Sequence, residues 1–127
     1  RPRSRLADAQ VVAEALRGRE VLVVDDVSDN RLLVERYLRP TGVTFRAASG
    51  GREAIEAVRS SPPDAILMDV QMPEMDGYEA TQRIRGLGYD RPILALTAHA
   101  MREEVERCRA AGCDAVLTKP IDRHALA

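Results

Sequence analysis

From residue 20 onward, the chain alternates between short apolar runs and longer segments in which apolar residues recur at helical spacing. Continuous apolar runs, as opposed to alternating apolar and polar residues, are typical of strands buried on both faces of a parallel sheet. Five runs fit this description, the second of them weakly: residues 21–24, 44–48, 65–68, 93–96 and 115–117. The pattern therefore predicts five parallel strands.

The segments between these runs predict helices that end at proline or glycine. The first follows Ser28, stops at Pro40 and is expected to share one side among Leu32, Leu33, Tyr37 and Leu38. The others are marked by Ala54, Ile55 and Val58 before Pro62, by Ala80 and Ile84 before Gly86, and by Met101, Val105 and Cys108 before a left-handed C-cap at Gly112.

Strands that alternate with helices predict βαβ units and a parallel sheet covered by helices on both sides. The expected fold class is α/β, a doubly wound (βα)5 domain over residues 20–127. Its fifth helix has only residues 121–127 to build from.

An additional amphipathic helix is expected before the first strand, over residues 6–17. Leu6, Ala9, Ala13 and Leu16 lie along one face, and Gly18 ends the segment. We interpret residues 1–19 as a helical linker from an upstream domain, which extends away from the main domain or packs on a neighbour.

Length, net charge and cysteine content argue against a nucleic-acid-binding protein, a membrane protein and a zinc site. A length of 127 residues suits one domain. A net charge of −1 offers no field to attract nucleic acid, and no apolar run approaches the roughly 20 residues of a membrane helix. Cys108 and Cys113 are interpreted as thiols in a reducing compartment, because only two histidines accompany them. We therefore expect a cytoplasmic domain without direct membrane contact.

Polar residues follow four of the five predicted strands. Asp25 and Asp26 end the first, Asp69 the third, Thr97 the fourth, and Thr118-Lys119 the fifth. Ligands of open parallel sheets bind outside the carboxyl ends of the strands. These side chains are therefore expected to converge at one edge of the sheet.

Three converging carboxylates repel one another unless a cation joins them. Oxygen ligands of this kind suit Mg²⁺, which also binds phosphate oxygens. With Thr97 as a hydroxyl donor and Lys119 as a cation, the set can hold a phosphoryl group during its transfer. Asp69 can then attack phosphorus to form an acyl phosphate.

Each residue also has a simpler interpretation. Asp25 and Asp26 could cap the helix near Ser28, Asp69 could belong to a helix-terminal turn, Thr97 could bond the backbone, and Lys119-Pro120 could be ordinary turn chemistry. The simultaneous occurrence of all of them at strand ends favours a functional site.

Four segments resemble the receiver domain of two-component response regulators, and the resemblance covers nearly all of residues 20–127. They are Val21-Leu22-Val23-Val24-Asp25-Asp26, the stretch from Leu67 to Gly77 around Asp69, Leu96-Thr97-Ala98-His99-Ala100, and Leu117-Thr118-Lys119-Pro120. The resemblance implies a flavodoxin-like three-layer sandwich with strand order 2-1-3-4-5.

The resemblance also implies residue roles. Asp69 would be phosphorylated, and Asp26 would bind Mg²⁺, or Mn²⁺ in its place, directly. Asp25 would support the metal mostly through water, and Gln71 would add its backbone carbonyl.

The other two roles concern the phosphoryl group. Thr97 would bind a phosphoryl oxygen and Lys119 would pair with the phosphate, across a cis Lys119-Pro120 bond.

Residues 72–85 and 97–104 are similar to receivers at the C-terminal end of hybrid histidine kinases. In such systems the phosphoryl donor is a phosphohistidine of the kinase, and the acceptor is often a histidine phosphotransfer domain. One departure stands three residues before the lysine, where receivers often carry Tyr or Phe and this chain has Val116. Because valine has no ring to relocate, we expect phosphorylation to change this face less than the loops around Asp69 and Thr97.

Three other functions fit these residues less well. A haloacid-dehalogenase-like phosphatase would need a second carboxylate where Gln71 stands. A flavodoxin-like cofactor binder would need a phosphate loop where the acidic segment from Asp25 to Asn30 lies. A degenerate receiver would lack one of the key residues.

Overall fold

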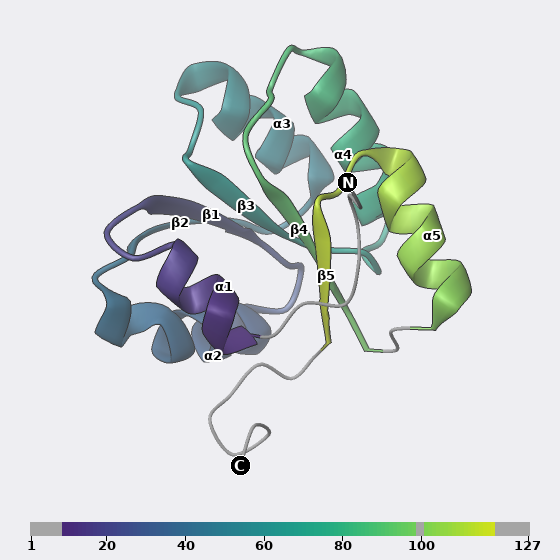
Figure 1. The fold of residues 1–127 in the computed structure, drawn as a ribbon. Coiled ribbons are helices and arrows are strands. Elements are labelled where there is room, and N and C mark those ends of the chain that lie inside the picture. Colours follow the sequence, from purple (N-terminus) through teal and green to yellow (C-terminus); the bar gives the residue numbers. More distant parts are fainter. Residues whose placement is uncertain (1–8, 99–100, 119–127) are drawn as a thin grey trace.

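The computed structural model describes residues 9–98 and 101–118 of the chain. In this part, strands and helices alternate as the sequence predicts, after one preceding helix (Figure 1). A short 3₁₀ helix, Arg39–Thr41, follows α2. The other elements are α1 (Ala9–Ala15), β1 (Glu20–Val24), α2 (Ser28–Leu38), β2 (Thr44–Ala48), α3 (Gly51–Ser60), β3 (Ala65–Asp69), α4 (Gly77–Gly86), β4 (Ile93–Thr97), α5 (Arg102–Ala111) and β5 (Ala115–Thr118).

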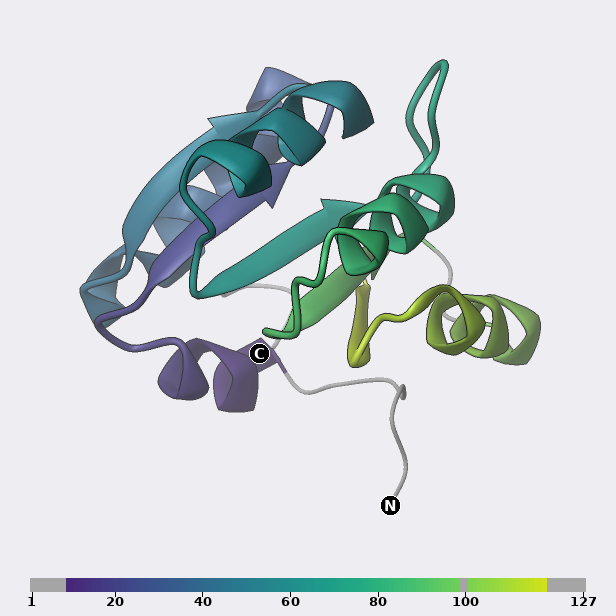
Figure 2. The ribbon, with the colours of Figure 1, turned by 90° about the horizontal axis from the view of Figure 1, so that it is seen from above.

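The five strands form one parallel sheet in the order β2-β1-β3-β4-β5, which confirms the predicted fold class and strand order. Helices α3, α4 and α5 cover one face of the sheet, and α1 and α2 cover the other (Figures 1 and 2). The predicted fifth helix of the repeat, residues 121–127, lies outside the described residues.

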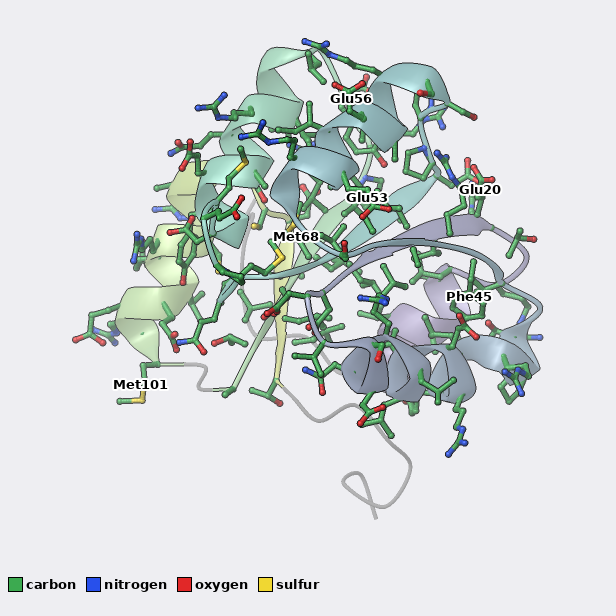
Figure 3. All side chains as sticks on the ribbon, turned by 180° about the vertical axis from the view of Figure 1, so that it is seen from behind. Glu20, Phe45, Glu53, Glu56, Met68 and Met101 are labelled. Atoms are coloured by element: carbon green, nitrogen blue, oxygen red, sulfur yellow. The ribbon has the colours of Figure 1, made fainter. Side chains whose placement is uncertain are left out.

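Each face of the sheet has its own hydrophobic core. Ile66 and Met68 of β3 lie in the core beneath α3, α4 and α5 (Met68 in Figure 3), whereas Ala65 and Leu67 lie in the core beneath α1 and α2. Successive side chains of a strand point to opposite faces. A strand buried on both faces must therefore be apolar at every position, which explains the continuous runs.

One side of α2 differs from the expectation. Val34 and Leu38 are buried, whereas Leu32 is 43% exposed, so placing Leu32 on the inner side was wrong. Val34 and Leu38 are four residues apart and share a helix face. Leu32 is six residues from Leu38, which at 3.6 residues per turn turns it well away from that face.

Helix α5 ends as predicted, with Gly112 in the left-handed region at a φ of 115°. The N–H of Cys113 donates to the carbonyl of Cys108 at 2.9 Å, which is the terminal bond of a Schellman motif. The two cysteines occupy the positions where this motif normally places an apolar contact. Both are free thiols and buried. A side-chain hydrogen bond with the Cys108 thiol, together with burial, raises the pKa of the Cys113 thiol.

Helix α1 packs on the domain itself. Ala13 and Leu16 are buried in the same core as Val21 and Leu38, and the N–H of Gly18 donates to the carbonyl of Thr41 at 3.2 Å. The expectation that this helix extends away from the domain was therefore wrong. Its role as a linker from an upstream domain stays a prediction.

Replacing Leu16 by alanine should lower the free energy of unfolding by about 2–5 kcal/mol, because it removes buried methyl groups from a packed core. Urea denaturation measures the change. Val11→Ala is the matched control: Val11 is 66% exposed and alanine favours the helix, so little stability should be lost. Equal, small effects of both substitutions would contradict the packing of α1 on the core.

None of the helices in the part of the chain that the structure describes is long and apolar enough to span a bilayer.

Candidate functional site

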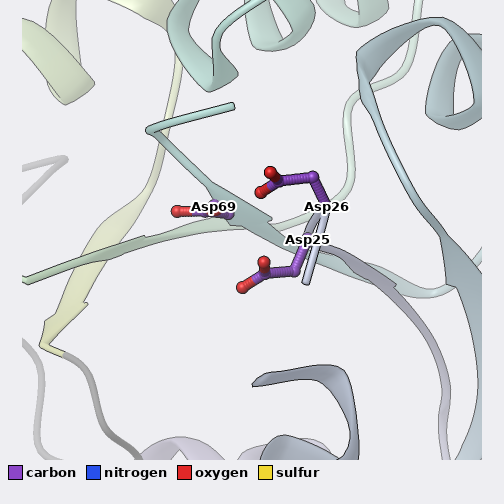
Figure 4. Close-up of side chains that lie close together, drawn as sticks. All are labelled: Asp25, Asp26 and Asp69. Carbon is purple, nitrogen blue, oxygen red and sulfur yellow. The ribbon is translucent and has the colours of Figure 1, made fainter. Parts of the chain in front are cut away.

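The acidic residues gather where β1 and β3 end side by side. The two strands pair in parallel with Val24 opposite Met68, so Asp25 and Asp69 follow at the same edge. One carboxylate oxygen from each of Asp25, Asp26 and Asp69 lies within 4.8 Å of the others (Figure 4). The predicted convergence of the three carboxylates is confirmed.

The three carboxylates differ in exposure. Asp25 and Asp69 are each 1% exposed, whereas Asp26 is open to solvent. The site therefore has a buried floor and one carboxylate at its mouth. A small ion or an incoming group can reach it from the Asp26 side.

Hydrogen bonds fix Asp25 at the end of β1. Its N–H donates to the Ala48 carbonyl of β2 at 3.1 Å, and its Oδ1 accepts from the N–H of Val27 at 2.9 Å and from Nδ2 of Asn30 at 3.4 Å. Arg31 donates to its carbonyl at 2.5 Å. The N-cap of α2 is Val27, without a side-chain cap bond, so Asp25 and Asp26 are not helix caps.

Asp69 is the last residue of β3, and its surroundings are equally tight. Its Oδ1 accepts from the N–H of Gln71 at 3.2 Å, and the following N–H, that of Val70, donates to the Leu96 carbonyl of β4 at 3.1 Å. Gly77 presses against the Asp69 backbone: a Cβ at Gly77 would lie 2.2 Å from the Asp69 carbonyl oxygen. The backbone of Asp69, the candidate nucleophile, is therefore confined by the close approach of Gly77.

Thr97 ends β4 at the same edge of the sheet and is 1% exposed. Its Oγ1 donates to Oε2 of Glu104 on α5 at 3.2 Å. Thr118 ends β5 opposite Thr97 and is exposed. Lys119 and the Lys119-Pro120 bond lie outside the described residues, so their predicted roles stay predictions.

The acidic cluster suits a hard divalent cation. It offers only oxygen ligands, and two of the three side chains have given up nearly all contact with water. Carboxylates in such a position repel unless a cation joins them, and Mg²⁺ binds one or two carboxylates while keeping several waters.

Comparison with known proteins decides the family. The family model described as the response regulator receiver domain matches residues 21–127. The chain belongs to this family. The resemblance inferred from the four sequence segments is therefore confirmed.

The receiver is similar to segments of much longer sensor kinases. It is 43% identical over 101 residues to the sensor histidine kinase RcsC of Escherichia coli K12, a match that covers 80% of this chain and 11% of RcsC. It is 46% identical over 116 residues to the sensor protein GacS of Pseudomonas syringae, a match that covers 87% of this chain and 13% of GacS. The chain thus spans little more than a tenth of the length of these relatives.

Solved structures agree with this assignment. The receiver domain of the histidine kinase CKI1 from Arabidopsis thaliana, complexed with Mg²⁺, is 38% identical, with a TM-score of 0.75 and coverage of 90% of this chain and 92% of that one. Chemotaxis protein CheY4 of Vibrio cholerae is 33% identical, with a TM-score of 0.78 and coverage of 84% and 91%.

The receiver is therefore a two-component signalling domain of the type found in hybrid histidine kinases, and accepting a phosphoryl group is the standard function of its family. The family binds Mg²⁺ in an acidic pocket, and the carboxylate cluster of this receiver matches that requirement.

A groove of about 500 Å³ adjoins the acidic cluster, between the β3–α4 loop and α5. The Arg107 guanidinium lies over the Tyr78 ring, 4.1 Å from its centre, and burial is the main cause that raises the pKa of Tyr78 to about 12. Gln71 is the one lining residue with a role predicted from the sequence, that of a backbone-carbonyl ligand of the metal. The helical spacing of Glu104 and Arg107 gives only a weak signal of a shared face. The lining residues are Val70, Gln71, Met72, Pro73, Asp76, Tyr78, Glu104 and Arg107.

Proposed function

We propose that Asp69 is the residue of this receiver that accepts the phosphoryl group. The observation that carries the proposal is the cluster of three carboxylates, in which Asp69 is buried at the end of the central strand β3. Asp69 is buried at the floor of the site, whereas Asp26 is exposed at its mouth. An attacking carboxylate at the floor meets a phosphorus atom that enters from solvent.

The transfer exchanges one bond for another. An oxygen of Asp69 forms a bond to phosphorus while the bond from phosphorus to the donor's imidazole nitrogen breaks, and the bonding electron pair stays on that nitrogen. The products are an acyl phosphate and a neutral imidazole, which keeps the proton on its other nitrogen.

Asp25, Asp26, Asp69 and the backbone carbonyl of Gln71 are the proposed holders of Mg²⁺, with Mn²⁺ as a substitute. When bound, the cation neutralises charge on the carboxylates and on the phosphoryl oxygens. Thr97 donates its hydroxyl to a phosphoryl oxygen, and Lys119 pairs with the phosphate.

The parent protein and its partners are also proposals. Similarity to short segments of RcsC and GacS supports a hybrid histidine kinase as the parent. The donor is then a phosphohistidine of a kinase, and a histidine phosphotransfer domain is the proposed acceptor. Two free, buried cysteines support a cytoplasmic location, where thiols stay reduced.

The direct test is incubation with a small phosphodonor, such as acetyl phosphate, in the presence of Mg²⁺. Intact mass should rise by one phosphoryl group, and peptide mapping should place an acid-labile phosphate on Asp69. A phosphatase assay on a chromogenic phosphomonoester should show no appreciable turnover. Rapid turnover would favour a phosphatase instead.

Asp26→Ala should abolish the Mg²⁺ dependence of phosphorylation. In metal-free buffer it should raise the melting temperature, because it removes one of three repelling carboxylates. A gain of about 1 kcal/mol corresponds to a rise of about 4 °C for a domain of this size. Asp29→Ala is the control, since Asp29 is an exposed carboxylate of the neighbouring helical turn outside the cluster. A lower melting temperature of Asp26→Ala without metal would contradict the crowded site.

A further inference from the structure

Thr97 is hydrogen-bonded to Glu104, a residue to which neither the sequence nor the proposed function gives a role. Its hydroxyl donates to Oε2 of Glu104 at 3.2 Å, and this bond joins the end of β4 to the first turn of α5. A hydroxyl carries a single proton and donates to one acceptor at a time. While the proton points to Glu104, it cannot point to a phosphoryl oxygen.

The second oxygen of Glu104 has an unfavourable environment. Oε1 is buried and has no hydrogen-bond partner among the described residues. A buried carboxylate oxygen without a partner loses its hydration without compensation. The hydrogen bond to Thr97 is therefore offset by the cost of the unpaired Oε1, and moving the Glu104 carboxylate to a hydrated position costs little free energy.

We propose that Glu104 is a positioning residue that holds Thr97 in the resting receiver and competes with the phosphoryl group for the Thr97 hydroxyl. This inference rests on the proposed function, in which Thr97 donates to a phosphoryl oxygen. Two effects act in the same direction. Glu104 occupies the proton of Thr97, and its negative charge disfavours a phosphoryl group beside it.

The groove next to the site has room for the Glu104 side chain once it leaves Thr97. Glu104 and Arg107 both line it, and they stand three residues apart on α5, a spacing that brings side chains together. Arg107 already lies over the Tyr78 ring and is 3.9 Å from Asp76, which is the outer limit of an ion pair. Once released from Thr97, the Glu104 carboxylate can turn toward this guanidinium.

The test is a titration of the receiver with beryllofluoride and Mg²⁺, in which beryllofluoride stands in for the phosphoryl group. Glu104→Ala should tighten binding about ten- to a hundredfold, the order expected for removal of one charge-assisted hydrogen bond that must be broken. Glu104→Gln keeps the shape and one acceptor oxygen, so it should tighten binding less. If Glu104→Ala does not fold, the beryllofluoride affinity of Glu104→Gln alone tests the proposal.

Two controls separate positioning from general effects. Glu103→Ala removes the same charge from an exposed residue of the same helical turn and should leave the affinity unchanged. In a Thr97→Val background, Glu104→Ala should lose most of its effect, because a residue that acts through Thr97 has nothing left to hold.

Several results would overturn the inference: no tightening by either Glu104 variant, equal tightening by Glu103→Ala, or full tightening in the Thr97→Val background. Failure of the proposed function looks different. Wild-type receiver would then not bind beryllofluoride at all, and the inference would fall with it.

Discussion

Replacing Asp69 by asparagine is expected to abolish phosphoryl acceptance and to leave the fold intact. An amide has no anionic oxygen to attack phosphorus. Asparagine has nearly the same shape, and its amide oxygen can still accept from the N–H of Gln71, so the end of β3 keeps its hydrogen bond. Incubation with acetyl phosphate and Mg²⁺, followed by intact mass and peptide mapping, should show no acid-labile phosphate.

The matched control is Asp64→Asn, at the opposite end of β3. Asp64 is a half-buried carboxylate that accepts from the N–H of Glu20 at 2.9 Å, and the length of β3 separates it from the acidic cluster. Its variant should still take up one phosphoryl group. A stoichiometric acid-labile phosphate on Asp69→Asn would show that another residue is the acceptor.

Gly77→Ala should strongly destabilise the domain, because the added methyl group meets the backbone beside Asp69. The added Cβ would lie 2.2 Å from the Asp69 carbonyl oxygen and 2.7 Å from Cα of Val70. Both contacts are with backbone, which cannot turn aside as a side chain does. Overpacking typically costs about 1–3 kcal/mol, and contacts this short with backbone place Gly77→Ala at the upper end of that range. Because the atoms that must shift carry Asp69, the rate of phosphorylation should fall as well.

Urea denaturation and the rate of phosphorylation by acetyl phosphate measure the two effects. Gly86→Ala is the control at the other end of α4, because a Cβ there would meet nothing within 4 Å. Alanine favours a helix over glycine, so this variant should be unchanged or more stable by up to about 1 kcal/mol. If Gly77→Ala were as stable and as readily phosphorylated as Gly86→Ala, the close approach of α4 to Asp69 would be wrong.

The fold could be predicted because its strands are buried on both faces. That burial leaves an unbroken apolar run in the sequence, and Pro62 or Gly112 ends the helix before each next run. The two errors concern how helices meet the core. Leu32 was placed on the wrong side of α2, and α1 was expected to leave the domain, because helical spacing alone does not say which surface a face will meet.

The acidic cluster could be predicted for a topological reason. Parallel strands end at one edge, so residues after them must converge whatever the details of packing. The roles of Gly77 and Glu104 could not be predicted in this way. The first depends on how closely α4 approaches β3, and the second on the rotation of α5 that brings Glu104 to Thr97.

The placement of α1 has a consequence for how the domain can be joined to other domains. Helix α1 is anchored in the core on one face of the sheet, whereas Thr97 contacts Glu104 of α5, which covers the opposite face (Figure 1). A change at Thr97 that passes into α5 therefore acts on the face of the sheet opposite to the one on which α1 packs. A partner that binds the α5 face is thus better placed to respond to such a change than a domain that is joined through α1.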